Sequence, residues 1–167
     1  GTEPQKQPMT MAQLMSHSAG FGVSAVYRDV KLDETDLQGM VDKLKALPLE
    51  TQPGSAWDYG PSVNIQGYII EKLSGQSLDV YFARNIFEPL GMVDTGFWVP
   101  AEKAGRVVAV HTYGPDGAIR VQIDGTVKTT RPRFLAGSGG LMSTVRDYWR
   151  FAQAVANGGE LDGKRIL

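Results

Sequence analysis

One stretch organises this chain: PGSAWDYGPSVNIQGYIIEKLSG, which runs from Pro53 to Gly75. It opens with a Pro-Gly turn and places Trp57 and Tyr59 on a tight corner. Pro61 suits the first turn of a following helix, because its missing N–H would have no partner there. Apolar residues recur at three- and four-residue spacings, and Gly75 is expected to end the helix. The apolar residues are Val63, Ile65, Ile69, Ile70 and Leu73. A tyrosine on such a corner can aim its phenol oxygen into a cleft, and a purely structural tyrosine can occupy the same position.

The composition is that of an ordinary soluble domain. The chain has 167 residues, of which 42% are hydrophobic and 21% are charged, enough for one domain with a real core. The formal net charge of −1 argues against a nucleic-acid partner, since phosphate binding needs clustered Lys and Arg. No apolar run approaches the ~20 residues that span a bilayer. We therefore expect a soluble protein with no membrane span, whether cytoplasmic or periplasmic, and the compartment stays open.

Two helices are predicted before the corner. Thr10 is expected to cap a short helix over residues 11–16, with Gln13 completing a capping box. Its inward-facing residues are predicted to be Met11, Leu14 and Met15. The second helix takes its N-cap from Asp33–Asp36 and is stopped by Pro48. Its apolar stripe is predicted to consist of Leu37, Met40, Val41, Leu44 and Leu47.

The second half of the chain combines helices with a hairpin. A helix is predicted over residues 78–87, and a β-hairpin over residues 106–123 with its turn at 114–117. A loop over residues 124–140 ends in glycines, and Ser143 or Thr144 is expected to cap a last helix. The core face of that helix is predicted to be Val145, Tyr148, Trp149, Ala152 and Val155. Asn157-Gly158-Gly159 is expected to end it, before a turn at 161–164. The fold class is therefore α+β, mainly helical, with one small β-hairpin.

Metal, phosphate and cofactor chemistry find little support in the residues. The two histidines, His17 and His111, have no second ligand at a metal-binding spacing, so we interpret His17 as a cap or packing residue and His111 as a structural residue of a strand. There is no cysteine for a thiolate site or a cysteine nucleophile. The run Gly137–Gly140 lacks the spacing and the lysine of a phosphate-binding loop. We therefore predict no metal and no cofactor.

Serine chemistry is also incomplete within the chain. Ala136-Gly137-Ser138-Gly139-Gly140 nearly matches a Gly-x-Ser-x-Gly nucleophile elbow, but both histidines precede Ser138, which is the wrong order for that fold. A Gly-rich turn that allows close backbone approach is the better interpretation. No serine has a lysine three places later, so the Ser-x-x-Lys pair of a lysine-activated nucleophile is missing.

Five segments, in order along the chain, carry a further signal: Met9–Gly20, Pro53–Gly75, Ile86–Phe97, Gly139–Asp147 and Asn157–Leu167. Taken together, they resemble the motifs of the serine β-lactamase and penicillin-binding-protein superfamily, and within it those of the class C-like esterases (family VIII carboxylesterases). The segment Ile86–Phe97 is the most specific match.

The resemblance implies a two-part fold, with an active site between an α/β sheet domain and a helical domain. Residues 1–167 would be the helical domain, with the nucleophilic Ser and Lys upstream and a third motif downstream. The missing initiator Met agrees with the expectation that both ends are cut. The resemblance also implies that Tyr59 moves the proton from the nucleophile to the leaving group. This requires a cation beside the phenol, so Tyr59 alone should be unactivated.

Further site residues follow from the resemblance with less support. Phe21, Trp98 and the turn containing Ser138 and Gly139 are expected to line the cleft for an acyl or alcohol group, and simple packing is an equal alternative. Pro61 stands where β-lactamases of this class carry an Asn that binds the lactam side chain. This departure favours an esterase over a strong β-lactamase.

The sequence thus predicts part of a serine hydrolase that forms an acyl-enzyme on a small ester or amide substrate. The leading reading is a carboxylesterase on short-chain esters, with weak β-lactam hydrolysis. One alternative is a D-amino-acid peptidase or carboxypeptidase on the same fold. The other is a non-catalytic binding module, in which apolar surface left bare by missing sheet contacts would drive self-association.

Overall fold

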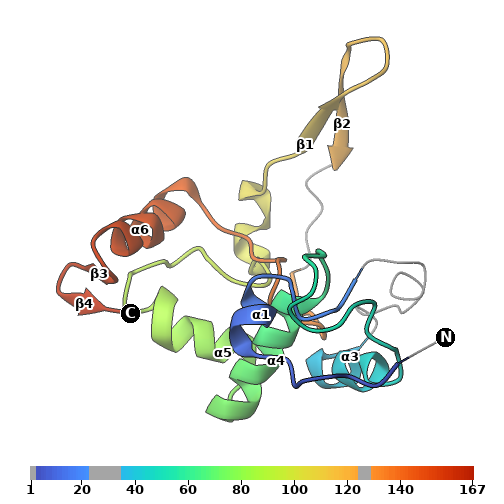
Figure 1. Ribbon diagram of the computed structural model, residues 1–167. Coiled ribbons are helices and arrows are strands. Elements are labelled where there is room, and N and C mark those ends of the chain that lie inside the picture. Colours follow the sequence, from blue (N-terminus) through green and yellow to red (C-terminus); the bar gives the residue numbers. More distant parts are fainter. Residues whose placement is uncertain (1–2, 23–34, 124–128) are drawn as a thin grey trace. The chain divides into compact units, whose positions relative to one another are not determined.

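The computed structural model describes residues 3–22, 35–123 and 129–167 (Figure 1). The chain divides into two compact units, residues 1–85 with 133–140, and residues 86–132 with 141–167. The candidate N-cap Asp33 and the start of the predicted loop at 124–140 lie outside the described residues. Among the helices of the described part, none combines the length and the apolar character that crossing a bilayer requires.

The first unit is built around α4 (Ser62–Ser74), which contacts α1 (Met11–Met15), α3 (Leu37–Leu44) and α5 (Leu78–Phe82) (Figure 1). Its buried apolar residues come from all three neighbours and from the returning segment 133–140. They are Leu14, Ala19, Leu37, Met40, Leu44, Leu78 and Leu135. α4 itself buries only two small residues, Ser62 and Gly67, so the other helices supply the large core side chains around it.

The ends of these helices confirm the capping predictions. Thr10 and Gln13 form the capping box of α1, and the Asp36 carboxylate accepts a hydrogen bond from the Gly39 amide at the start of α3 (2.8 Å). Gly75 ends α4 in the left-handed region, at φ 68°. Such a cap stops a helix at little cost only when the residue lacks a Cβ.

Two predicted apolar faces in the first unit are only partly buried. In α1, Leu14 is buried but Met11 and Met15 are exposed, because a five-residue helix turns only one position toward its neighbours. In α4, Leu73 is 85% exposed, and the remaining apolar residues are half-buried. A Cβ at Gly67 would lie 3.1 Å from the Leu78 side chain and 3.3 Å from the Gly137 Cα, so neighbouring segments cover α4 closely at this small residue.

The predicted helix over residues 78–87 is present but changes its winding. It begins as α5 and continues as a π-helix, η2 (Ala83–Phe87). The Asn85 side-chain amide donates to the Tyr81 carbonyl (2.8 Å). That carbonyl would be the acceptor of the Asn85 backbone N–H in an α-helix, so the side chain competes for it.

The second unit contains the 3₁₀-helix η3 (Ala101–Arg106), two β-hairpins and the α-helix α6 (Val145–Ala156). Strands β1 (Val110–Tyr113) and β2 (Ile119–Ile123) pair antiparallel across the predicted turn. A second, two-residue hairpin, β3 (Glu160–Leu161) with β4 (Lys164–Arg165), forms where the sequence predicts only a turn. Its corner residues Asp162 and Gly163 both have positive φ, as a tight two-residue hairpin requires. The buried apolar residues of this unit are Phe87, Leu90, Met92, Phe97 and Ala154.

The predicted core face of α6 is wrong. Thr144 caps the helix as expected, but the five predicted core positions, 145, 148, 149, 152 and 155, are all exposed. The buried residues are Asp147 and Ala154. The Asp147 carboxylate accepts hydrogen bonds from the Asp94 amide (2.7 Å) and the Thr95 hydroxyl (2.9 Å), so α6 packs through a hydrogen-bonded polar side.

Candidate active site

The segment that carries Tyr59 is held to the end of α1 by backbone hydrogen bonds. The Gly54 amide donates to the Ser18 carbonyl (2.8 Å), and the Asp58 amide donates to the His17 carbonyl (2.9 Å). Gly54 has a φ of 86°, which the predicted Pro-Gly turn needs. The backbone of residues 53–58 is therefore held at two separate points, and the second of them directly precedes Tyr59.

Tyr59 is exposed although its backbone is fixed. Its side chain is 56% exposed, and its ring stacks on the His17 imidazole with 4.7 Å between the ring centres and 26° between the planes. The Gly60 amide donates to His17 Nδ1 (3.4 Å), and the Trp57 ring meets His17 edge-on at 6.3 Å. The corner therefore presents a phenol to solvent on a rigid support.

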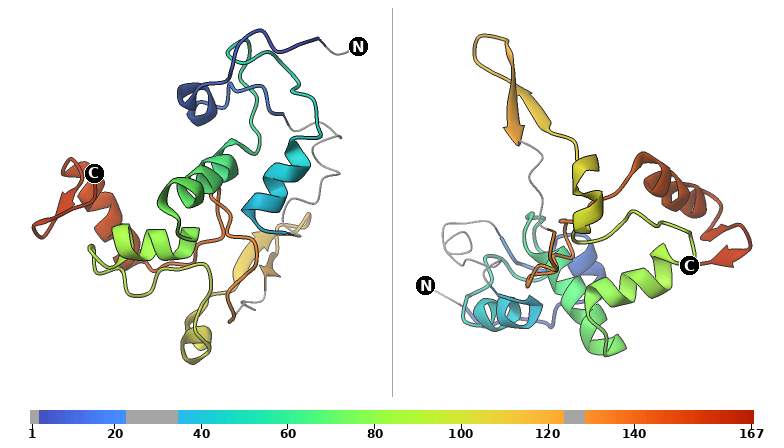
Figure 2. Two further views of the ribbon diagram at one scale, coloured as in Figure 1. Left: turned by 90° about the horizontal axis from the view of Figure 1, so that it is seen from below. Right: turned by 180° about the vertical axis from the view of Figure 1, so that it is seen from behind.

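Helix α4 begins at Ser62, two residues after Gly60, and its first turn holds the Gly-rich segment 137–140. The Asn64 side-chain oxygen accepts hydrogen bonds from the Ser138 amide (3.0 Å) and the Ser138 hydroxyl (2.9 Å). Gly137 lies so close to α4 that a Cβ there would collide with the Val63 carbonyl oxygen. A Cβ on Gly67 would lie 3.3 Å from the Gly137 Cα, so both glycines permit this contact. The returning segment 133–140 accordingly runs beside α4 (Figure 2).

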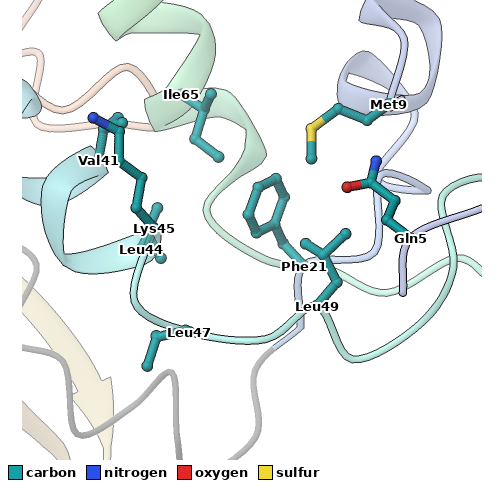
Figure 3. Close-up of a pocket in the computed structure, with 9 residues that line it drawn as sticks. All are labelled: Gln5, Met9, Phe21, Val41, Leu44, Lys45, Leu47, Leu49 and Ile65. Atoms are coloured by element: carbon teal, nitrogen blue, oxygen red, sulfur yellow. The ribbon is translucent and has the colours of Figure 1, made fainter. Parts of the chain in front are cut away.

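The predicted site residues of the first unit divide into two places. Residues 59–64 connect the first two of them: the stretch begins with Tyr59 and ends with Asn64, which binds Ser138. Gly139 is exposed next to Ser138, with open space where a Cβ would lie. Phe21 instead lines a separate cavity of about 240 Å³ (Figure 3). The cavity is lined by Gln5, Met9, Phe21, Val41, Leu44, Lys45, Leu47, Leu49 and Ile65.

This cavity is mainly apolar, with one charged lining residue. Lys45 forms an ion pair with Asp42 (2.9 Å), and the hydrogen bond that its ammonium donates to the Asp42 carboxylate raises the pKa of Lys45. The same bond, with a second from Gln38, lowers the pKa of Asp42. Phe21 and Ile65 face the same hollow as Met9 in Figure 3, so the cavity suits an apolar group of modest size.

Trp98 belongs to the second unit. It is half-buried in the segment between η2 and η3, next to the bridge that Gly96 forms with Met142. This unit also contains the ion pairs of Asp94 with Lys103 (2.6 Å) and Arg106 (2.9 Å), which fix η3. Among the residues that the structure describes, no three His, Asp or Glu side chains gather as a metal site would require.

Two contributors to the site carry no functional signal in the sequence. The sequence predicts a cap or packing role for His17, and His17 does pack, but on Tyr59, 42 residues away. Asn64 has no role that the sequence predicts, and its side chain holds Ser138. Neither contact leaves a signal in local periodicity, because both join segments distant in the chain.

Known proteins resemble the whole of this chain. A lovastatin esterase from Penicillium rubens is 28% identical over 171 residues, covering 95% of this chain and 43% of its own length. A putative D-alanyl-D-alanine carboxypeptidase from Escherichia coli is 28% identical over 173 residues, covering 92% of this chain and 40% of its own length. The structure of EstCE1, described as a hydrolase with promiscuous acyltransferase activity, superposes with a TM-score of 0.76 at 17% identity, over 96% of this chain and 49% of EstCE1.

The chain therefore spans less than half the length of the curated relatives it matches. The profile of one family, Beta-lactamase, matches it from residue 1 to residue 167. With the mainly helical fold and the ordered motifs around Tyr59, this match places the chain in the Beta-lactamase family, within the serine β-lactamase and penicillin-binding-protein superfamily.

Proposed function

We propose that this chain is the helical portion of a serine carboxylesterase that acts on short-chain esters through an acyl-enzyme, with Tyr59 as its general acid and base. The observation that carries the proposal is the exposed phenol on a fixed backbone. A proton-transfer group must reach the reacting atoms while its position stays set, and Tyr59 has both properties.

The surroundings of Tyr59 supply the support that such a group needs. The His17 ring limits where the phenol can move, and the Asn64 oxygen keeps Ser138 and its glycines near the start of α4. Phe21 lines an apolar cavity apart from this corner, and we propose that this cavity holds an acyl chain or an alcohol group. Trp98 and Gly139 are proposed to line the substrate cleft of the full-length protein.

Pro61 supports an esterase rather than a strong β-lactamase. It is buried as the N-cap of α4 and has no side-chain amide to offer a lactam substituent. The nearest amide along the chain, that of Asn64, already uses its oxygen to hold Ser138. β-Lactam hydrolysis by the full-length protein is therefore expected to be slower than ester hydrolysis.

Replacing the phenol tests the proposal directly. In the full-length protein that contains this chain, Tyr59→Phe should lower kcat/KM for p-nitrophenyl butyrate by about 10²- to 10⁴-fold, the usual contribution of general acid–base catalysis. Tyr113→Phe, an equally conservative change on exposed strand β1, is the matched control and should leave the rate unchanged. Full activity of the Tyr59→Phe enzyme would refute the catalytic role.

The 167-residue chain by itself is proposed to be catalytically silent, because it contains no Ser-x-x-Lys pair to form the acyl-enzyme. Purified chain should hydrolyse p-nitrophenyl butyrate no faster than buffer. An ester-hydrolysis rate that persists in the chain and in its Tyr59→Phe variant, after purification controls, would contradict this account.

A D-amino-acid peptidase or carboxypeptidase is the second candidate, and the similarity to the E. coli carboxypeptidase-like relative favours it. The two activities differ in the bond that is cleaved. A full-length protein that releases D-alanine from D-Ala-D-Ala peptides faster than it cleaves p-nitrophenyl esters would establish the peptidase and displace the esterase.

A further inference from the structure

His17 occupies a backbone position that favours glycine. It follows α1 at a φ of 56°, in the left-handed region, where a side chain with a Cβ is disfavoured. The chain contains a direct comparison, since α4 ends on Gly75 in the same region at φ 68°. A helix stop alone would be served better by glycine, so the imidazole at position 17 needs a reason beyond ending α1.

The contacts of His17 supply that reason, because they involve three consecutive residues of the corner. Its carbonyl oxygen accepts from the Asp58 amide (2.9 Å), its ring stacks on Tyr59 (4.7 Å), and its Nδ1 accepts from the Gly60 amide (3.4 Å). A single residue thus holds Tyr59 by its ring and by the backbone on both sides. The carbonyl bond comes from the backbone and any residue would make it, whereas the stack and the bond to Gly60 need an aromatic ring with an acceptor at the δ position.

The hydrogen bond to Gly60 also bears on the tautomer of the imidazole. An Nδ1 that accepts an N–H uses its lone pair, so this bond calls for a proton on Nε2. The imidazole thus contacts the corner through a ring stack and an accepted hydrogen bond, and both are positional contacts.

We propose that His17 is the positioning residue of Tyr59: it fixes the phenol in the place from which it transfers protons, and it does not touch substrate. This inference rests on the proposed function of Tyr59. Proton transfer is sensitive to displacements of the order of 1 Å. Loss of the clamp should therefore reduce kcat and leave KM nearly unchanged.

The kinetic test uses three variants of the full-length protein. His17→Asn tolerates the left-handed backbone and keeps an acceptor but lacks the ring, His17→Phe keeps a ring but lacks the acceptor, and His17→Gly lacks both. We expect kcat to fall by about 10- to 100-fold in His17→Gly, and by less in the other two, with KM within about twofold. His111→Asn, on strand β1, is the matched control and should behave as the unmodified protein.

A spectroscopic arm tests the clamp without reference to activity. In full-length protein labelled with ¹⁵N-histidine and ¹³C-tyrosine, the signals lost in His17→Asn and Tyr59→Phe identify the two rings. The His17 signals should show the Nε2–H tautomer, and the Tyr59 ring signals should shift in all three His17 variants but not in His111→Asn. Unchanged Tyr59 signals in folded His17→Gly would overturn the inference.

The two arms separate the possible failures. If Tyr59→Phe abolishes activity while His17→Gly keeps full kcat, the positioning role is wrong and the proposed function stands. If Tyr59→Phe is fully active, the proposed function fails and the catalytic role of the clamp fails with it. A His17→Gly variant with low kcat, unchanged KM and shifted Tyr59 signals supports both.

Discussion

Helices α3 and α6 have similar sequence patterns, but the apolar face is buried in α3 and exposed in α6. Each begins with a side-chain cap, Asp36 in α3 and Thr144 in α6, and each has an amphipathic pattern. In α3 the apolar residues Leu37, Met40 and Leu44 are buried. In α6 the corresponding face is bare, and Val145 is 90%, Tyr148 66% and Trp149 55% exposed. Periodicity therefore identifies the residues that share a face, whereas burial depends on a partner that periodicity does not reveal.

The largest expected difference between the two helices is in stability. Met40→Ala should lower the free energy of unfolding by about 2–5 kcal/mol, because it leaves a cavity in the core of the first unit. Trp149→Ala removes a larger side chain but should change it by only about 0.5 kcal/mol, because that side chain is exposed. Urea unfolding of the 167-residue chain followed by far-UV circular dichroism measures both. A cost for Trp149→Ala as large as that for Met40→Ala would show that the α6 face is covered.

The bare face of α6 should also make the 167-residue chain associate with itself. Val145, Tyr148, Trp149 and Ala152 lie on one side of the helix, and a contiguous apolar patch of this kind favours association. Trp149→Lys should shift sedimentation velocity profiles toward monomer. Leu73→Lys, which removes a single exposed apolar residue on α4, is the matched control and should not. Monomer at high concentration in the unmodified chain would count against a docking role for this face.

The same contrast separates what was predictable from the sequence. Helix starts and stops depend on residues within one turn, so Thr10 with Gln13, Asp36, Thr144 and Gly75 could be placed correctly. The β1–β2 turn was equally local. Three features could not be predicted in this way, because each joins segments far apart in the chain. They are the Phe21 cavity, the Asn64–Ser138 bonds and the His17–Tyr59 stack.

The family resemblance predicts a role for Tyr59, but the contacts that hold Tyr59 in place can be explained only from the fold. The sequence suggests that position 59 is a corner, since a Pro-Gly turn precedes it and Pro61 follows. It contains no sign that the residue after α1 would face that corner. The positive φ of His17 is the local trace of this arrangement, and it is visible only in the structure.

The smallest expected effect is a pH dependence of the stability of the second unit. Polar contacts hold α6 and the segments near it, whereas apolar side chains hold α3. Hydrogen bonds from Lys103 and then Arg106 lower the pKa of the Asp94 carboxyl. Because the folded-state pKa lies below the unfolded one, this contribution is complete above the ordinary carboxyl pKa of ~3.9 and is lost as the pH falls through the folded-state value. Asp94→Asn should therefore flatten the acid side of a plot of urea midpoint against pH and lower the midpoint near pH 7. Glu102→Gln removes one charge from the same 3₁₀-helix and should leave the shape of the plot intact. Parallel curves for Asp94→Asn and the unmodified chain would mean that the ion pairs of Asp94 do not contribute to folding.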